Sequence, residues 1–151
     1  MKKTIACLLA ALCLFCCVSC GEKNYEIDPG TLARDLLAAD CFELPPAEVP
    51  GALAGIAYGT EDGVDAVAYR GAGATAEEIT VFTAKDAAAA TTVLETAKQY
   101  IAAQEAIYRK YNAKEADRLN AAIVVRKGKY VVVVVCDDYA AAKAVIDKAF
   151  A

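Results

Sequence analysis

The chain has 151 residues, enough for one domain with short additions, and its formal net charge is −4. An acidic domain is repelled by phosphates, so we expect no nucleic-acid partner. Histidine and tryptophan are absent, and the single serine, Ser19, lies in a segment that we expect to be removed. A mature chain without serine or histidine holds no Ser-His-Asp triad or Cys-His pair, and no imidazole for zinc or copper. We therefore expect no catalytic residue, metal ligand or cofactor.

Residues 1–19 have the parts of a signal peptide. Lys2 and Lys3 form a basic start, and the apolar run over residues 5–18 is too short to span a bilayer as a helix. Residues 17–20 then read Cys-Val-Ser-Cys, and Cys20 is the one cysteine of the run that follows a small hydroxyl residue. This segment resembles a bacterial lipobox, whose last cysteine is lipidated and becomes the mature N-terminus, although Cys17 stands where leucine is usual.

The expected organisation is a lipoprotein signal peptide over residues 1–19, a lipid anchor and tether over residues 20–27, and a single domain over residues 28–151. One alternative is an ordinary secretory signal cut near the same place. Another is a zinc or redox C-x-x-C motif, which here lacks a second ligand pair. Cys41 and Cys136 remain in the domain; a disulfide is permitted outside the cytoplasm, but Cys136 also fits a buried apolar position. Their pairing stays open.

The strongest structural signal is the apolar run from Tyr130 to Cys136. It does not alternate, so it predicts a strand with both faces covered, in the interior of a sheet. A second β-branched run precedes it, and Arg126-Lys127-Gly128-Lys129 lies between the two. This pattern predicts a hairpin in which Gly128 takes a positive φ.

The other elements are predicted in chain order. Asp28 caps a first helix that runs to about Ala39, and residues 43–51, rich in proline, form a break. Residues 53–58 form a short helix or an edge strand, and residues 64–70 and 77–83 form two strands joined by a glycine-rich loop. Thr83 caps a long helix over residues 85–111, one further turn follows over residues 114–119, and Asp137 and Asp138 cap the last helix.

This order predicts an α+β fold: an antiparallel sheet of about four strands in two hairpins, packed against the long helix and the C-terminal helix. We expect these two helices to share one face of the sheet. The other face still carries every second valine of residues 130–136. The remaining apolar segment, with Leu32, Leu36, Leu37 and Leu53, is expected to cover it, unless that face binds a partner or a second copy.

Several of these residues resemble one known family. They are Glu78-Ile79 before Phe82, then the long helix, then residues 111–115 (Tyr-Asn-Ala-Lys-Glu), Asn120, and residues 128–131 (Gly-Lys-Tyr-Val). Together they resemble the small lipoproteins catalogued as domain of unknown function four-three-five-eight, found in Gram-positive bacteria. Ala113 departs from the proline that is usual there. The resemblance implies a location on the outer face of the cytoplasmic membrane, and it assigns no catalytic or binding residue.

Three groups of side chains are candidates for chemistry. Glu61, Asp62 and Asp65 lie near a glycine turn but lack the spacing of a calcium loop. The pairs Glu77/Glu78 and Asp137/Asp138 are candidate acid and base for glycoside cleavage, but neighbours in a strand point to opposite faces. Tyr100, Tyr108 and Tyr111 lie on one side of the long helix. They pack in the core with their hydroxyls at the rim, or they form an interaction surface.

Two classes of function are consistent with this sequence. The first is a membrane-anchored extracytoplasmic lipoprotein, a non-catalytic binding or accessory module. Its expected partners are the membrane, through a lipid on Cys20, and an envelope protein or peptide. The second is a small envelope hydrolase that uses carboxylates. The absence of histidine and of a serine in the mature chain favours the first class.

Overall fold

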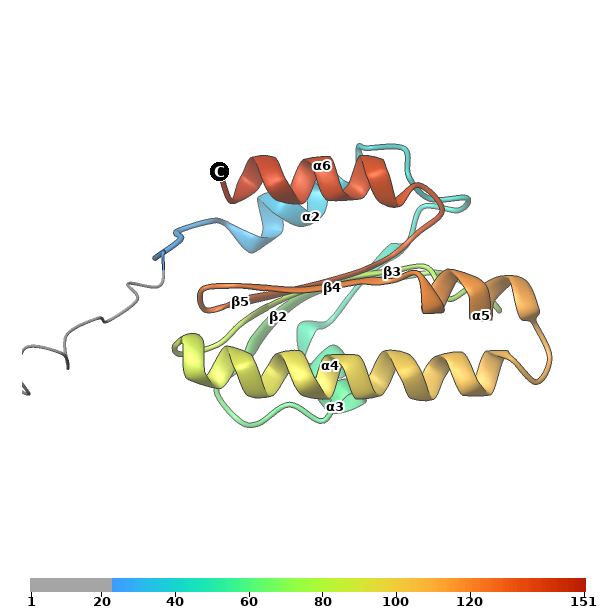
Figure 1. Cartoon of the computed structure of the whole chain (residues 1–151), viewed down its shortest axis with the longest axis horizontal. Helices are drawn as coiled ribbons and strands as arrows, with labels where there is room; N and C mark the ends of the chain where they lie inside the picture. The colour runs from blue at the N-terminus through green and yellow to red at the C-terminus, as the bar shows by residue number, and fades with distance from the viewer. Residues whose placement is uncertain (1–22) are drawn as a thin grey trace, which may run out of the picture.

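The computed structural model describes residues 23–151, which form helices on both faces of one sheet (Figure 1). The expected signal peptide and Cys20 lie outside the described residues. The helices are α2 (Pro29–Leu37), α3 (Gly51–Tyr58), α4 (Ala87–Tyr108), α5 (Ala113–Asn120) and α6 (Tyr139–Ala149). The strands are β1 (Ala47–Val49), β2 (Asp65–Arg70), β3 (Glu78–Thr83), β4 (Ile123–Lys127) and β5 (Tyr130–Val135).

The sheet is antiparallel, with the strand order β1-β2-β3-β5-β4. The α+β class and the two hairpins, β2–β3 and β4–β5, are confirmed, and the expected number of about four strands is one too low. The additional strand, β1, lies in the proline-rich segment predicted to be a break. Because Pro46 and Pro50 flank these three residues, β1 is short, and it occupies an edge of the sheet, where proline is tolerated.

The valine strand β5 is interior, as its sequence predicts. It pairs with β3 on one side and β4 on the other, and all six of its residues are buried. Successive residues point to opposite faces, so Val132 and Val134 pack in one apolar cluster while Val131, Val133 and Val135 pack in the other. Burying one such side chain stabilises the fold by about 1.5–3 kcal/mol.

Helices cover both faces of the sheet, but in a different combination from the expected one. Figure 1 shows α2 and α6 on one face and α3 and α4 on the other. The long helix and the C-terminal helix therefore do not share a face. The N-terminal helix covers the second face as expected, because Leu32 and Leu36 are buried against β3 and β5 beside Ile146 of α6. Leu53 does not take part; it is exposed on α3.

The helix ends follow their capping residues. Asp86, rather than Thr83, caps α4 by accepting from the Ala89 N–H at 2.8 Å, and the helix ends at Tyr108 rather than at Tyr111. Asn112 caps α5, which is a full helix rather than a single turn. Asp138 caps α6 as expected, whereas Asp137 binds elsewhere. Within residues 23–151 no helix combines the length and the apolar character needed to cross a membrane.

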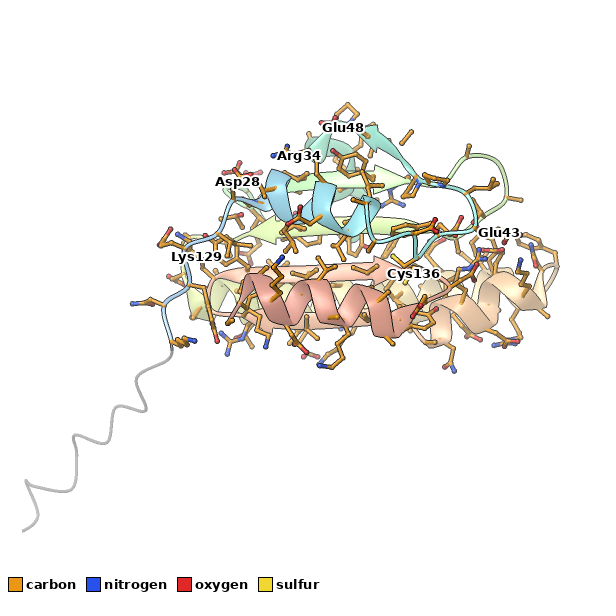
Figure 2. The ribbon with its side chains drawn as sticks, turned by 90° about the horizontal axis from the view of Figure 1, so that it is seen from above. Asp28, Arg34, Glu43, Glu48, Lys129 and Cys136 are labelled. Atoms are coloured by element: carbon orange, nitrogen blue, oxygen red, sulfur yellow. The ribbon has the colours of Figure 1, made fainter. Side chains whose placement is uncertain are left out.

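Residues 23–27, which the sequence assigns to the tether, lie along the β4–β5 hairpin. The Tyr25 ring meets Phe150 edge-on, with centroids 5.2 Å apart, and the Ile27 N–H donates to the Tyr130 hydroxyl at 3.4 Å. Gly128 has φ 57° as expected, and a Cβ there would lie 3.4 Å from the Tyr25 ring. The described chain thus enters the domain at the tip of this hairpin, close to Lys129 (Figure 2).

Candidate functional site

A polar cavity of about 190 Å³ lies where the β2–β3 hairpin ends, beneath the second half of α4. Arg70 and Glu78 come from the two strands, and the glycine-rich loop over residues 71–76 forms one wall. Tyr100, Gln104 and Tyr108 form the opposite wall; they recur every fourth residue of α4 and so share one helical face. We call this site the Arg70 cavity.

The loop that borders the cavity is held in a narrow turn. The Gly71 N–H donates to the Glu77 carbonyl at 2.8 Å, and the Tyr108 hydroxyl donates to the Thr75 carbonyl at 3.2 Å. A Cβ at Gly71 would lie 2.4 Å from the Thr75 Cγ2, so this position requires glycine. Gly73, at the loop tip, has φ 72°. The loop wall is therefore set by backbone geometry and is anchored to α4.

Arg70 and Glu78 are opposite each other in the β2–β3 register, and Arg70 Nη1 lies 3.4 Å from Glu78 Oε2. Glu78 carries an ionisable side chain but is only 4 % exposed, like the other buried residues of β3. Its other oxygen, Oε1, accepts from the hydroxyls of Tyr58 and Thr80. Both carboxylate oxygens thus face donors, as a buried charge requires.

The two terminal nitrogens of the Arg70 guanidinium differ in their hydrogen bonding. Nη1 donates to the Tyr100 hydroxyl at 2.7 Å, and the guanidinium carbon lies 5.5 Å from the Tyr100 ring centroid. Tyr58 stacks on Tyr100 with centroids 3.9 Å apart. Nη2 is buried and has no hydrogen-bond acceptor in the described part of the chain. A buried donor without an acceptor costs about 1–3 kcal/mol, so native folds seldom keep one.

Burial perturbs the ionisation of these groups. Burial raises the pKa of Glu78, and the positive charge of Arg70 and the hydrogen bonds from Tyr58 and Thr80 only partly oppose this. Burial, together with the charge of Glu78, raises the pKa of Tyr58 well above its ordinary value. Perturbed carboxyl groups beside a cavity are a known feature of functional sites, though also of structural ion pairs.

A second polar network lies beside the cavity and is built around Arg118, which is buried. Its guanidinium donates to Glu115 at 2.6 Å, to Asp137 at 2.8 Å and to Glu43 at 2.9 Å. Burial disfavours its charged form, but the hydrogen bonds to Asp137 and Glu43 outweigh this and raise the pKa of Arg118. Glu115 also accepts from the Ala76 N–H at 2.7 Å. This network joins α5 and the segment after β5 to the loop of the cavity.

The three tyrosines of the predicted interaction surface lie in different settings. Tyr100 and Tyr108 line the Arg70 cavity, and both hydroxyls are hydrogen-bonded. Tyr111 lies beyond the end of α4 and is 63 % exposed, with its ring centroid 5.2 Å from that of Tyr108. Two of the three therefore belong to a cavity rather than to a surface.

The carboxylate pairs considered for catalysis do not converge. Glu77 and Glu78 both border the cavity, but Glu77 accepts from the backbone N–H groups of Glu43 and Leu44 at 2.6 and 3.1 Å. Asp137 binds Arg118, while Asp138 caps α6.

The remaining candidates are an acidic turn and two cysteines. Glu61, Asp62 and Asp65 are exposed, and among residues 23–151 no cluster of three or more acidic or cysteine side chains is arranged to hold a metal ion. Cys41 and Cys136 are buried free thiols, and the Cys41 thiol donates to the Leu36 carbonyl at 3.7 Å.

Sequence reasoning missed Arg70, Tyr58 and Gln104 as site residues. One signal was available in part. The predicted strands, residues 64–70 and 77–83, bring Arg70 close to Glu77 and Glu78 at the loop end of a hairpin, and the structure pairs Arg70 with Glu78. A glutamate inside an otherwise apolar strand is a second such signal. Neither Tyr58 nor Gln104 has a comparable pattern, because tertiary packing alone brings α3 and α4 to this place.

The structure is an α+β domain with a polar cavity at one end of its sheet. The chain belongs to the family described as Domain of unknown function (DUF4358), which matches residues 58–136. This confirms the family resemblance seen in the sequence. The matched segment contains all the residues that line the Arg70 cavity and the whole of β2, β3 and β5. No curated protein and no solved structure gave a significant match to the chain.

Proposed function

We propose that the protein is a lipid-anchored, extracytoplasmic, non-catalytic binding module of a Gram-positive envelope, and that its ligand occupies the Arg70 cavity. The observation that carries the proposal is Arg70 Nη2, a buried donor that lacks an acceptor although its side chain lines a cavity. Unsatisfied polar groups are costly and call for a physical reason. A ligand that supplies the acceptor is such a reason.

The position of the cavity supports a role for an anchored protein. The described chain reaches the domain at the β4–β5 hairpin tip, beside Tyr130, which pairs with Thr83. The cavity lies at the other end of β3, where Glu78 pairs with Val135, five residues or about 17 Å from Thr83. Figure 2 shows Lys129 at the first end and Cys136 and Glu43 toward the other. A lipid on Cys20 would therefore leave the cavity directed away from the membrane.

The alternative, a small hydrolase that uses carboxylates, requires two acidic groups that converge on one substrate bond. In the Arg70 cavity the Glu77 oxygens already accept from two backbone N–H groups and from the Thr75 hydroxyl. Glu78 accepts from Tyr58 and Thr80 and pairs with Arg70. Since each carboxylate is committed to its own donors, the arrangement favours binding over catalysis.

Two measurements test the proposal. Intact-mass analysis of the protein from its native membrane should show a mature chain that starts at a diacylated or triacylated Cys20, and Cys20→Ala should remain unprocessed or leave the membrane. A mature N-terminus without lipid would overturn the anchoring part.

For binding, the small-molecule fraction of an envelope extract should raise the melting temperature of the parent protein. Gln104→Trp fills the cavity from α4 and should remove this shift, whereas Gln99→Trp, on an exposed part of the same helix, should keep it. A shift of equal size in both variants would show that the ligand binds elsewhere, and no shift in the parent would overturn the binding part.

A further inference from the structure

We propose that the Arg70 cavity recognises a carboxylate group, at the end of a small organic acid or at the C-terminus of a peptide. This inference rests on the proposed binding function and names the chemistry of its ligand. In the bound state Arg70 holds two carboxylates, with Nη1 on Glu78 and Nη2 on the ligand.

Three side chains that line the cavity have a hydrogen-bond donor not used within the described part of the chain. Arg70 Nη2 lacks an acceptor, and the Tyr100 hydroxyl, which accepts from Arg70, keeps its own hydrogen for a further bond. Gln104 lines the same wall, and within residues 23–151 its side-chain amide has no hydrogen-bond partner. A positively charged donor with neutral donors beside it suits a ligand group that has hydrogen-bond acceptors and no donors, such as a carboxylate. The hydrogen bonds between guanidinium and carboxylate groups are among the strongest in proteins.

Charge and size decide among acceptors. Glu77, Glu78 and Glu115 lie at or near the cavity, and among the described residues only the guanidinium groups of Arg70 and Arg118 oppose their charge. A doubly charged phosphate would therefore meet more repulsion here than a singly charged carboxylate. The cavity volume of about 190 Å³ is small, since typical small-molecule pockets have about 300–1,000 Å³. This space accommodates a small terminal group, and a longer ligand would extend out of the cavity.

Access requires only a local adjustment of Arg70. Nη2 itself is shielded, but 30 % of the Arg70 side chain is exposed, and the side chain borders the cavity. Binding therefore requires the guanidinium to turn so that Nη2 reaches the cavity while Nη1 stays within reach of Glu78. The rotation is favourable when an acceptor is present, because it removes the cost of the unpaired donor.

The test compares N-acetyl-alanine with its primary amide, two probes of equal size that differ in the carboxylate. The purified mature protein should bind the acid at least about tenfold more tightly, since a hydrogen bond to a charged group contributes well over that factor. Arg70→Gln should abolish this preference, and Arg34→Gln, an exposed arginine on the opposite face of the sheet, should keep it. Equal binding of acid and amide by the parent protein, or a preference that survives in Arg70→Gln, would overturn the inference.

Glu78→Gln provides a second test, in which the affinity for the acid should rise instead of fall. It keeps the hydrogen bonds from Tyr58 and Thr80 but removes the negative charge that competes for Arg70, so it should bind the acid several-fold more tightly than the parent. This variant keeps the inference testable if Arg70→Gln does not fold, which circular dichroism will show. Weaker or unchanged binding of the acid by a folded Glu78→Gln protein would contradict the model of a shared guanidinium.

A glycine-alanine tetrapeptide with a free or an amidated C-terminus separates the two sources of the carboxylate. If the free peptide binds more tightly than N-acetyl-alanine, the group comes from a peptide C-terminus; if it binds less tightly, the ligand is a small acid. If none of these carboxylate probes binds, but an envelope component binds the parent and not Gln104→Trp, this inference is overturned and the proposed binding function stands. Failure of both tests would overturn both.

Discussion

Arg70 and Glu78 face each other at the loop end of the β2–β3 hairpin, with Arg70 Nη1 3.4 Å from Glu78 Oε2. The two partners are buried to different extents: the Glu78 side chain is 5 % exposed and the Arg70 side chain 30 %. The cation therefore reaches the cavity, while the carboxylate stays beneath it and accepts from Tyr58 and Thr80. The carboxylate ligand that we propose would therefore share this guanidinium with Glu78.

Glu78→Gln should change the pH dependence of stability. Below the unfolded-state pKa of glutamate, about 4.3, Glu78 is neutral in both states and has no electrostatic cost. As the pH rises, the unfolded chain ionises first because burial raises the pKa of Glu78 in the fold, so the parent loses stability until the folded pKa is passed. A glutamine at this position does not ionise, so the variant has no such loss. The variant should therefore gain on the parent by about 1.4 kcal/mol for each unit of the pKa difference.

Urea unfolding at about pH 4 and about pH 7.5 measures this gain. Glu48→Gln, at an exposed position of the edge strand β1, is the matched control and should follow the parent (Figure 2). If the difference in unfolding free energy between the parent and Glu78→Gln is the same at both pH values, the prediction is contradicted.

Arg118→Met should destabilise the domain strongly. Methionine is an unbranched side chain that occupies part of the space of the arginine, but it carries no charge. Three carboxylates then lose the cation that they share: the buried Glu115 and the half-exposed Glu43 and Asp137. Breaking a buried ion pair by removing one partner costs about 3–5 kcal/mol. Arg109→Met removes an arginine that also has two acidic partners but is 46 % exposed, and should cost no more than about 1 kcal/mol. Equal losses in chemical unfolding would show that the Arg118 network is no stronger than a surface one.

The fold was largely predictable because its signals are local. Hydrophobic runs, the glycine of the β4–β5 turn and the caps at Asp28 and Asp138 each act within a few residues, and the structure places strands and helices accordingly. The distribution of the helices was not predictable. The apolar faces of α4 and α6 fit either side of a sheet whose central strand is apolar on both faces, so tertiary packing alone decides that they lie on opposite sides.

The candidate site was predictable only in part, for a related reason. Tyr100 and Tyr108 follow from helical spacing, and the pairing of Arg70 with Glu78 follows from the hairpin. The third component, Tyr58, reaches Glu78 from α3, which precedes both strands. No sequence period connects residues whose contact depends on how a short helix packs beneath a sheet. A buried donor without an acceptor is likewise visible only in three dimensions.

Val133→Asp should unfold the domain. Val133 is fully buried in the cluster beneath α4, and β5 is paired on both sides, so no movement of an edge strand exposes the new charge to water. An unpaired buried carboxylate costs several kcal/mol, a large part of the stability of a domain of this size. Ile56→Asp makes a comparable change at a residue that is 77 % exposed on α3, and should leave the melting temperature within a few degrees. A Val133→Asp protein that melts with the parent would refute the interior position of β5.

Cys41 and Cys136 should react slowly with thiol reagents in the native protein. They are 1 % and 0 % exposed, and burial raises the pKa of both thiols. Because the thiolate is the reactive form, both burial and the raised pKa suppress reaction with Ellman's reagent until the fold opens. Ala140→Cys places a reporter thiol at an exposed position of α6 and should react at once in the same sample. In denaturant the two native thiols should become as reactive as the reporter. Native thiols that match the reporter before denaturation would contradict their burial, and a denatured parent without reactive thiols would show that the pair is oxidised to a disulfide.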